Sequence, residues 1–202
     1  MAKEPEGVGY ATGRATKADI VEAAFHVFAE SGYGGTSVRE IARRAGINHA
    51  TLLHHFPHKW LLLQSVLEHR DEIQHIEPTS LDETLALLLG IAIRNEETPG
   101  LTRLFTLLAA ESADPDHPAR AYFRDRLARL RHQIAHHIEL AQATGQVPAD
   151  VQPLLAATDI VALWEGLQLQ GPISDLPVSV PDHLAAMFAT VAGHRIEPMF
   201  LP

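Results

Sequence analysis

The segment TSVREIARRAGINHATLLHHFPHK, residues 36–59, contains two short helical patterns that meet at one glycine. Ser37 and Glu40 have the spacing of a capping box, in which a serine oxygen and a glutamate carboxylate accept hydrogen bonds from backbone N–H groups at the start of a helix. Gly46 stands where the first helix must end in a left-handed turn, and Asn48 can cap a second short helix. The spacing predicts a helix-turn-helix motif.

The second helix of this motif has one apolar face and one polar face. Ile47, Leu52 and Phe56 form the apolar face, and a helix this short needs neighbours that pack against that face. The other side chains can donate hydrogen bonds, and we expect them to point outward. They are Asn48, His49, Thr51, His54 and His55, followed by Lys59.

The residue types before and after the turn match, position by position, those of successive helices in a known protein family. Six positions have the types of a first helix and its exit turn: Ile20, Ala23, Ala24, Phe28, Gly32 and Tyr33. Residues 36–42 match a second helix, and residues 45–47, 51–52, 55–56 and 59 match a recognition helix and the entry to a fourth helix. Over residues 16–63 the chain therefore resembles the DNA-binding domain of TetR-family transcriptional regulators.

The resemblance implies two kinds of DNA contact. The base-reading surface corresponds to Arg39, His49, Ala50, Leu53 and His54, with Asn48 beside it. The phosphate-contacting rim corresponds to Ser37, Thr51, His55 and Lys59. Arg39 is expected to read a guanine through two hydrogen bonds, and a solvated charge is the alternative. Leu53 stands where the family usually has tyrosine, so the operator sequences of other members do not transfer.

The charge of the 202-residue chain is segregated. Its net charge is −9, yet the first 60 residues hold seven basic and six acidic side chains, against nine and 19 afterwards. DNA would repel the acidic part and attract the mildly positive end. Cysteine is absent, which excludes disulfides and thiolate sites. No signal peptide is visible, and the longest apolar run, residues 85–93, is too short to cross a bilayer. We therefore expect a cytoplasmic protein without a membrane partner.

Proline and glycine divide the chain into helical segments, and no strand alternation is visible. We expect an all-α fold in three parts: a disordered arm over residues 1–13, a three-helix helix-turn-helix DNA-binding domain over residues 14–57, and a larger helical effector-binding and dimerisation domain over residues 58–202. Outside the motif, helices are expected at about 16–31, 58–76, 81–95, 100–112, from after 118 to 144, 151–170 and 182–196.

The larger part is apolar enough to hold a ligand pocket between its helices. The residues expected to line this pocket are Phe105, Leu108, Phe123, His132, His136 and Trp164. Trp164 is the strongest of them, because a buried indole N–H needs an acceptor that a ligand could supply. Core packing is the alternative for each. Such a pocket suits a small apolar or amphipathic effector of unknown identity.

The last two helices have the pattern of an interface, with small residues between large ones. The expected contacts are Val161, Leu167, Leu184, Phe188 and Val191. TetR-like proteins pair these helices across a two-fold axis, so the resemblance implies a homodimer. A symmetric dimer requires a palindromic site in double-stranded DNA.

These features favour a homodimeric repressor that a small effector releases from its operator. The alternatives are a constitutive DNA-binding regulator or activator without an effector, and a helical enzyme that uses the histidine-rich body. No catalytic motif is recognisable. His132 and His136 could share a metal ion, but no further ligand completes that site. We therefore expect no catalytic residue, no cofactor and no metal.

Overall fold

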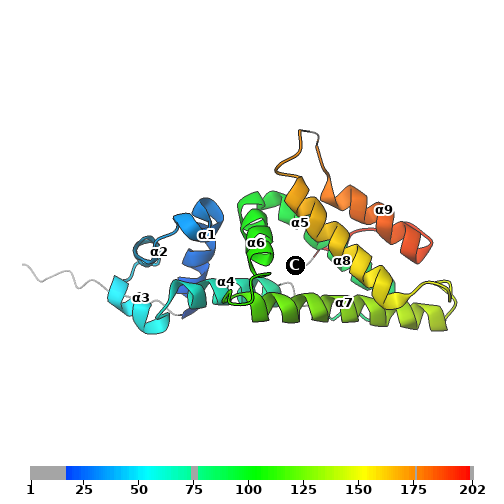
Figure 1. The fold of residues 1–202 in the computed structure, drawn as a ribbon, viewed down its shortest axis with the longest axis horizontal. Helices are drawn as coiled ribbons and strands as arrows, with labels where there is room; N and C mark the ends of the chain where they lie inside the picture. Colours follow the sequence, from blue (N-terminus) through cyan, green and yellow to red (C-terminus); the bar gives the residue numbers. More distant parts are fainter. Residues whose placement is uncertain (1–16, 74–76, 176, 201–202) are drawn as a thin grey trace, which may run out of the picture.

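The computed structural model describes residues 17–73, 77–175 and 177–200, and within these ranges the chain is helical without strands, which confirms the all-α prediction (Figure 1). The expected arm, residues 1–13, lies outside the described residues. One end of the molecule contains α1 (Lys17–Gly35), α2 (Val38–Arg44), α3 (His49–His55) and α4 (Lys59–Ile73). The other helices are α5 (Leu81–Glu97), α6 (Pro99–Glu111), α7 (Arg120–Ala143), α8 (Pro153–Gln170) and α9 (Val180–Ala192).

Local sequence explains the two short helices of the motif. The Ser37 hydroxyl oxygen accepts a hydrogen bond from the Glu40 N–H at 3.1 Å, and the Asn48 side chain caps α3 in the same way at 2.7 Å. Gly46 has a φ of +69°, in the left-handed region that favours glycine. The predicted capping box is only half formed, because the Glu40 carboxylate accepts from the Arg43 guanidinium at 2.6 Å.

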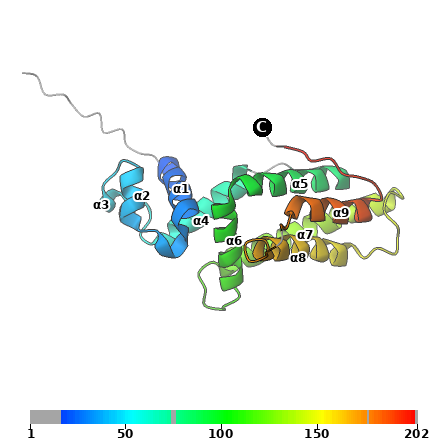
Figure 2. The same cartoon turned by 90° about the horizontal axis from the view of Figure 1, so that it is seen from above.

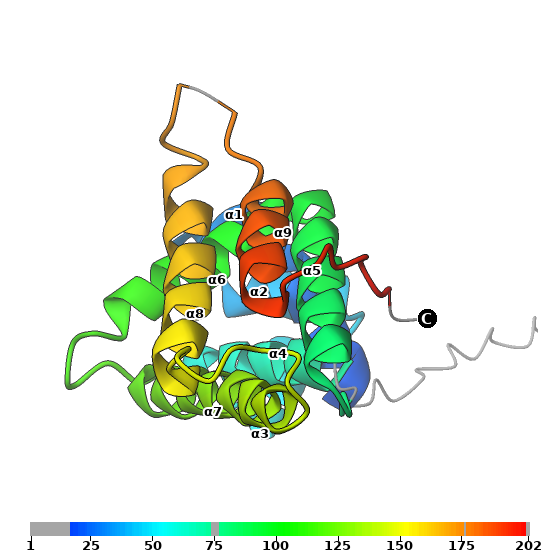
Figure 3. The ribbon, with the colours of Figure 1, turned by 90° about the vertical axis from the view of Figure 1, so that its right-hand side faces the viewer.

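The described residues pack into two hydrophobic cores. The head core joins α1–α4 with α6 and the beginning of α7. Its most buried members include Ile20, Phe28, Ile41, Leu52, Leu62, Leu63, Leu104, Phe105, Leu108 and Phe123. The body core joins α5, the rest of α7, α8 and α9, with α9 between α5 and α8 (Figure 3). The packing is thus continuous across residues 57 and 58, and α6 packs with the head (Figure 2).

The head meets α6 at a close approach of two backbones. A Cβ atom added at Gly100 would lie 2.1 Å from the carbonyl oxygen of Ala29 in α1. Any larger residue at this position would therefore push α6 and α1 apart. No helix within the described residues is both long enough and apolar enough to cross a membrane.

Candidate nucleic-acid interface and effector cavity

The outer face of α3 is exposed, as the sequence predicted. Leu52 and Phe56 anchor the helix in the head core, with 0% and 3% of their surfaces accessible. His49, Ala50, His54 and His55 are exposed, and Leu53 is 37% exposed. The face therefore combines imidazole groups with an alanine and a leucine that can contact thymine methyl groups. Contact with DNA at these residues remains a prediction.

Arg39 lies on the exposed side of α2. The other two arginines of this helix are paired: Arg43 with Glu40 and Arg44 with Glu30, each at 2.6 Å. These hydrogen bonds lower the pKa values of both glutamates. Arg39 has no hydrogen-bond or ion-pair partner among the described residues, so its charge is available to an outside anion or base.

Two hydroxyl groups expected at the phosphate rim also have local roles. The Ser37 oxygen caps α2, and the Thr51 hydroxyl donates to the Asn48 side-chain oxygen at 3.0 Å. The Asn48 side chain is therefore committed to the start of α3. Because Ser37 is exposed and Thr51 half-buried, both lie at the edge of the outward face.

Lys59 differs from the expected phosphate contact. Its ammonium donates hydrogen bonds to the backbone carbonyls of Tyr33, at 2.6 Å, and Thr36, at 3.0 Å. The same group lies 4.2 Å from the centre of the Tyr33 ring, within the range of a cation–π contact. A cation near the C-terminus of a helix satisfies carbonyls that have no partner in the helix. Lys59 thus ties the end of α1 to the start of α4.

The expected ligand pocket is dispersed in the structure, which corrects the prediction. Phe105, Leu108 and Phe123 fill the head core, where the Phe105 and Phe123 rings pack edge-on at 4.9 Å between centroids. His132 and His136 are exposed on the outer side of α7. Helical periodicity does not show which neighbouring helix covers a residue, so it could not determine whether these residues meet at one site. No group of three or more metal-ligating side chains occurs among the described residues.

Of the six expected pocket residues, Trp164 and Phe105 still border one cavity. Trp164 is the one with a buried polar atom that lacks a partner in the part of the chain that the structure describes. It is 8% exposed, and its indole N–H has no hydrogen-bond acceptor among the described residues. It borders a cavity of about 20 Å³ where the head core and the body core meet, room for about one water molecule. The other lining residues are Ile91, Asn95, Phe105, Arg126, Leu130, Glu165 and Gln168.

Larger recesses also open at the surface, and two of them were not predicted from the sequence. One, of about 250 Å³, is bounded by α5, α6, the end of α8 and the loop that follows. The other, of about 430 Å³, lies between α4 and α7. Each is made by side chains from separate helices, so no local pattern signals it.

Comparisons with known proteins cover both parts of the chain. Residues 20–66 match the model of the tetR family of bacterial regulatory proteins, and residues 88–187 match that of the tetracyclin repressor-like C-terminal domain. The chain belongs to the TetR family. This family consists of transcriptional regulators rather than enzymes, which removes the enzyme alternative.

Individual relatives agree with this membership. The A-factor receptor protein of Streptomyces griseus is 28% identical over 176 residues, which cover 84% of this chain but 57% of that protein. The HTH-type transcriptional regulator SrpR of Pseudomonas putida is 24% identical over 167 residues, 77% of this chain and 75% of that protein. A TetR transcription regulator from Haloarcula marismortui has the same fold, with a TM-score of 0.74 at 19% identity over 90% of this chain and 98% of that one.

The expected dimer contacts of this TetR-family chain need correction. Val161, Leu167, Leu184, Phe188 and Val191 are buried within the single chain, at most 9% exposed. A side chain covered by its own protomer has little surface left for a second copy. The outward faces of the same helices carry other residues: Leu154, Leu155, Ala162 and Leu169 on α8, and Ala186 and Thr190 on α9.

Proposed function

We propose that this TetR-family chain is a homodimeric repressor that reads a palindromic operator through α2 and α3 and is released by a small effector. The DNA-binding part would comprise residues 14–57, and the effector-binding and dimerisation part residues 58–202. The exposed outer face of α3, together with Arg39 of α2, which has no partner among the described residues, is the observation that carries the proposal.

The charges of the head support a defined contact rather than a diffuse one. Because Arg43 and Arg44 are neutralised by glutamates, Arg39 is the one arginine of α2 whose charge can meet DNA. A guanidinium can donate two hydrogen bonds to the O6 and N7 atoms of guanine. His49, Ala50, Leu53 and His54 would then contact neighbouring bases, and His55 a phosphate.

The dimer would form through the outward faces of α8 and α9. Leu154 and Leu155 are 51% and 55% exposed, and Leu169 is 43% exposed. Between these leucines, Ala162 and the half-buried Gly166 are small enough for a second helix to approach closely. Two-fold symmetry would place the two α3 helices in successive major grooves, on the order of 34–36 Å apart.

The effector would enter where the two cores meet. Trp164 belongs to the body core, whereas Phe105 on the opposite wall belongs to the head core. A ligand larger than one water would therefore have to separate α6 from α8, and it would move the head relative to the dimer helices. An apolar or amphipathic compound with one acceptor for the indole N–H fits this position. One relative is named a receptor, which supports a ligand for this chain.

Binding-site selection from random duplexes tests the DNA-binding proposal. We expect enrichment of one palindromic sequence whose affinity falls steeply with salt. A molecule that shows no preference among duplexes at low salt would refute the proposal.

A screen of metabolites for thermal stabilisation tests the effector proposal, because a ligand of the native state raises the melting temperature. We expect the active compound to stabilise the wild type and the Trp60→Phe control, to stabilise Trp164→Phe less, and to release the operator. Stabilisation without release would favour the constitutive regulator.

A further inference from the structure

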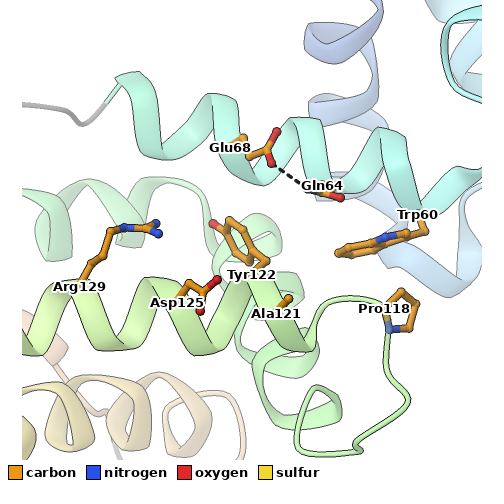
Figure 4. A pocket seen from close by; sticks show the side chains of 8 residues that line it. All are labelled: Trp60, Gln64, Glu68, Pro118, Ala121, Tyr122, Asp125 and Arg129. Carbon is orange, nitrogen blue, oxygen red and sulfur yellow. Dashed lines mark hydrogen bonds between the residues drawn. The ribbon is translucent and has the colours of Figure 1, made fainter.

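The recess between α4 and α7 is a cleft of about 430 Å³ (Figure 4), within the size range of small-molecule sites. Its lining comes from two helices and the turn before the second. These residues are Trp60, Gln64 and Glu68 from α4, with Pro118, Ala121, Tyr122, Asp125 and Arg129. The cleft is separate from the cavity at Trp164, because the two share no lining residue.

The apolar surface of the cleft suits a flat ring. Trp60 and Tyr122 are both half-buried, and Figure 4 shows them projecting into the space between the two helices. Pro118 borders the same end as Trp60, and Ala121 occupies little of the space. The Tyr122 hydroxyl points toward α4 and makes a long hydrogen bond of 3.4 Å to the Leu67 carbonyl.

The charges around the cleft favour a cation. Glu68 on α4 and Asp125 on α7 are exposed carboxylates that border the cleft from opposite helices (Figure 4). Glu68 accepts a hydrogen bond from Gln64 at 2.8 Å, and Asp125 accepts one from Arg124 at 2.7 Å. Arg129 is the single basic residue of the lining. The lining therefore carries a net charge of about −1 at neutral pH.

We propose that this cleft binds a small planar organic cation, with its ring against Trp60 and its charge between Glu68 and Asp125. A cationic ring would gain a cation–π contact with the indole and attraction to two carboxylates. An anion would meet both carboxylates, and of the two nearby guanidinium groups Arg129 is in the lining while Arg124 already donates to Asp125.

A ligand bound in the cleft would affect the head through Lys59, the residue before Trp60. Trp60 directly follows Lys59, whose ammonium holds the end of α1. A ligand that contacts both α4 and α7 would therefore restrain the tilt of the head against α7. This regulatory consequence rests on the proposed DNA-binding function, whereas the binding of the cation does not.

Three compounds with the same ring and different charges test the site: benzamidine, benzamide and benzoate. In the Trp164→Phe variant, Trp60 is the single tryptophan, so its fluorescence reports the cleft alone. We expect quenching by benzamidine at millimolar concentrations, weaker quenching by benzamide and the weakest by benzoate. Calorimetric titration of the wild type should give the same order and removes any dependence on the variant.

Two charge substitutions test whether the cleft prefers a ligand of positive charge. Glu68→Gln should weaken benzamidine binding about two- to fivefold, as expected for an exposed ion pair. Arg129→Gln should tighten it by a similar factor, because it removes the opposing charge. Glu97→Gln removes an exposed carboxylate outside the cleft and should leave the affinity unchanged.

Equal binding of the three compounds, or an Arg129→Gln variant that binds benzamidine more weakly, would overturn the inference. The selectivity of the same preparations for duplexes is measured separately. If they select a DNA sequence but fail to bind benzamidine in the cleft, the further inference fails while the proposed function stands.

Discussion

Replacing Lys59 with methionine removes the ammonium and keeps most of the aliphatic stem. The wild-type ammonium donates to two carbonyls, at 2.6 and 3.0 Å, and contacts the Tyr33 ring at 4.2 Å. A hydrogen bond from a charged donor contributes about 1.5–3 kcal/mol, and a cation–π contact about 0.5–1 kcal/mol where water reaches it. Because the site is half exposed, water partly replaces these contacts, and we expect a net loss of about 1–3 kcal/mol.

Two assays separate this internal role from a phosphate contact. In a chain of this size, the loss corresponds to a melting temperature lowered by about 2–12 °C. Operator affinity should fall because α1 and α4 no longer hold the recognition helix firmly. The slope of log affinity against log salt should stay the same, since a lost phosphate contact would reduce it by about 0.9.

Arg39→Met is the matched control for stability, because it removes an exposed cation of the same head that has no partner among the described residues. Its free energy of unfolding should lie within about 0.5 kcal/mol of the wild-type value. A Lys59→Met protein that melts like the wild type, with a salt slope reduced by about one charge, would refute the internal role and restore the phosphate contact.

Three other substitutions test the remaining structural claims. Gly100→Ala would place a Cβ atom 2.1 Å from the Ala29 carbonyl oxygen, and we expect overpacking to cost about 1–3 kcal/mol in denaturant unfolding. Ala162→Glu should yield monomers in sedimentation, because it places a charge on the outward face of α8. His137→Gln should reduce the loss of stability at acidic pH. Burial, and then the charge of His136, lower the pKa of His137, so below about pH 6.5 the unfolded chain binds a proton that the folded chain does not.

Each of these substitutions has a control of the same type. Gly34→Ala adds its methyl group to open space and should leave α1 and α6 in place. Ala110→Glu puts the charge on an exposed position of α6, where the dimer should persist. His132→Gln removes an exposed histidine of α7 and should retain the acid sensitivity. If variant and control behave alike in any pair, the corresponding structural claim is wrong.

The helix-turn-helix could be predicted because its signals are local. Ser37 and Asn48 each cap a helix through an N–H three residues away, and Gly46 occupies a backbone conformation that only glycine enters cheaply. The exposed histidines of α3 followed from the same short-range periodicity. Even within this segment the capping box failed in part, since Arg43 competes for the Glu40 carboxylate.

The proposed effector cavity and the proposed dimer face could not be predicted in the same way. A helical pattern shows that Phe105, Val161 and Phe188 point toward apolar surroundings. It does not show whether a neighbouring helix, a ligand or a second copy supplies those surroundings. The structure places Phe105 in the head core and the other two residues in the body core, so the chain itself covers all three.

The sequence by itself determined the helices, the turn between α2 and α3 and the residues that α3 presents, because each depends on contacts within a few positions. Only the tertiary structure decided that Lys59 binds carbonyls 26 and 23 residues earlier in the chain, and that Trp164 lies where two cores meet. The physical reason is that hydrogen bonding and packing between distant segments depend on how the helices assemble, and residue type alone does not specify that assembly.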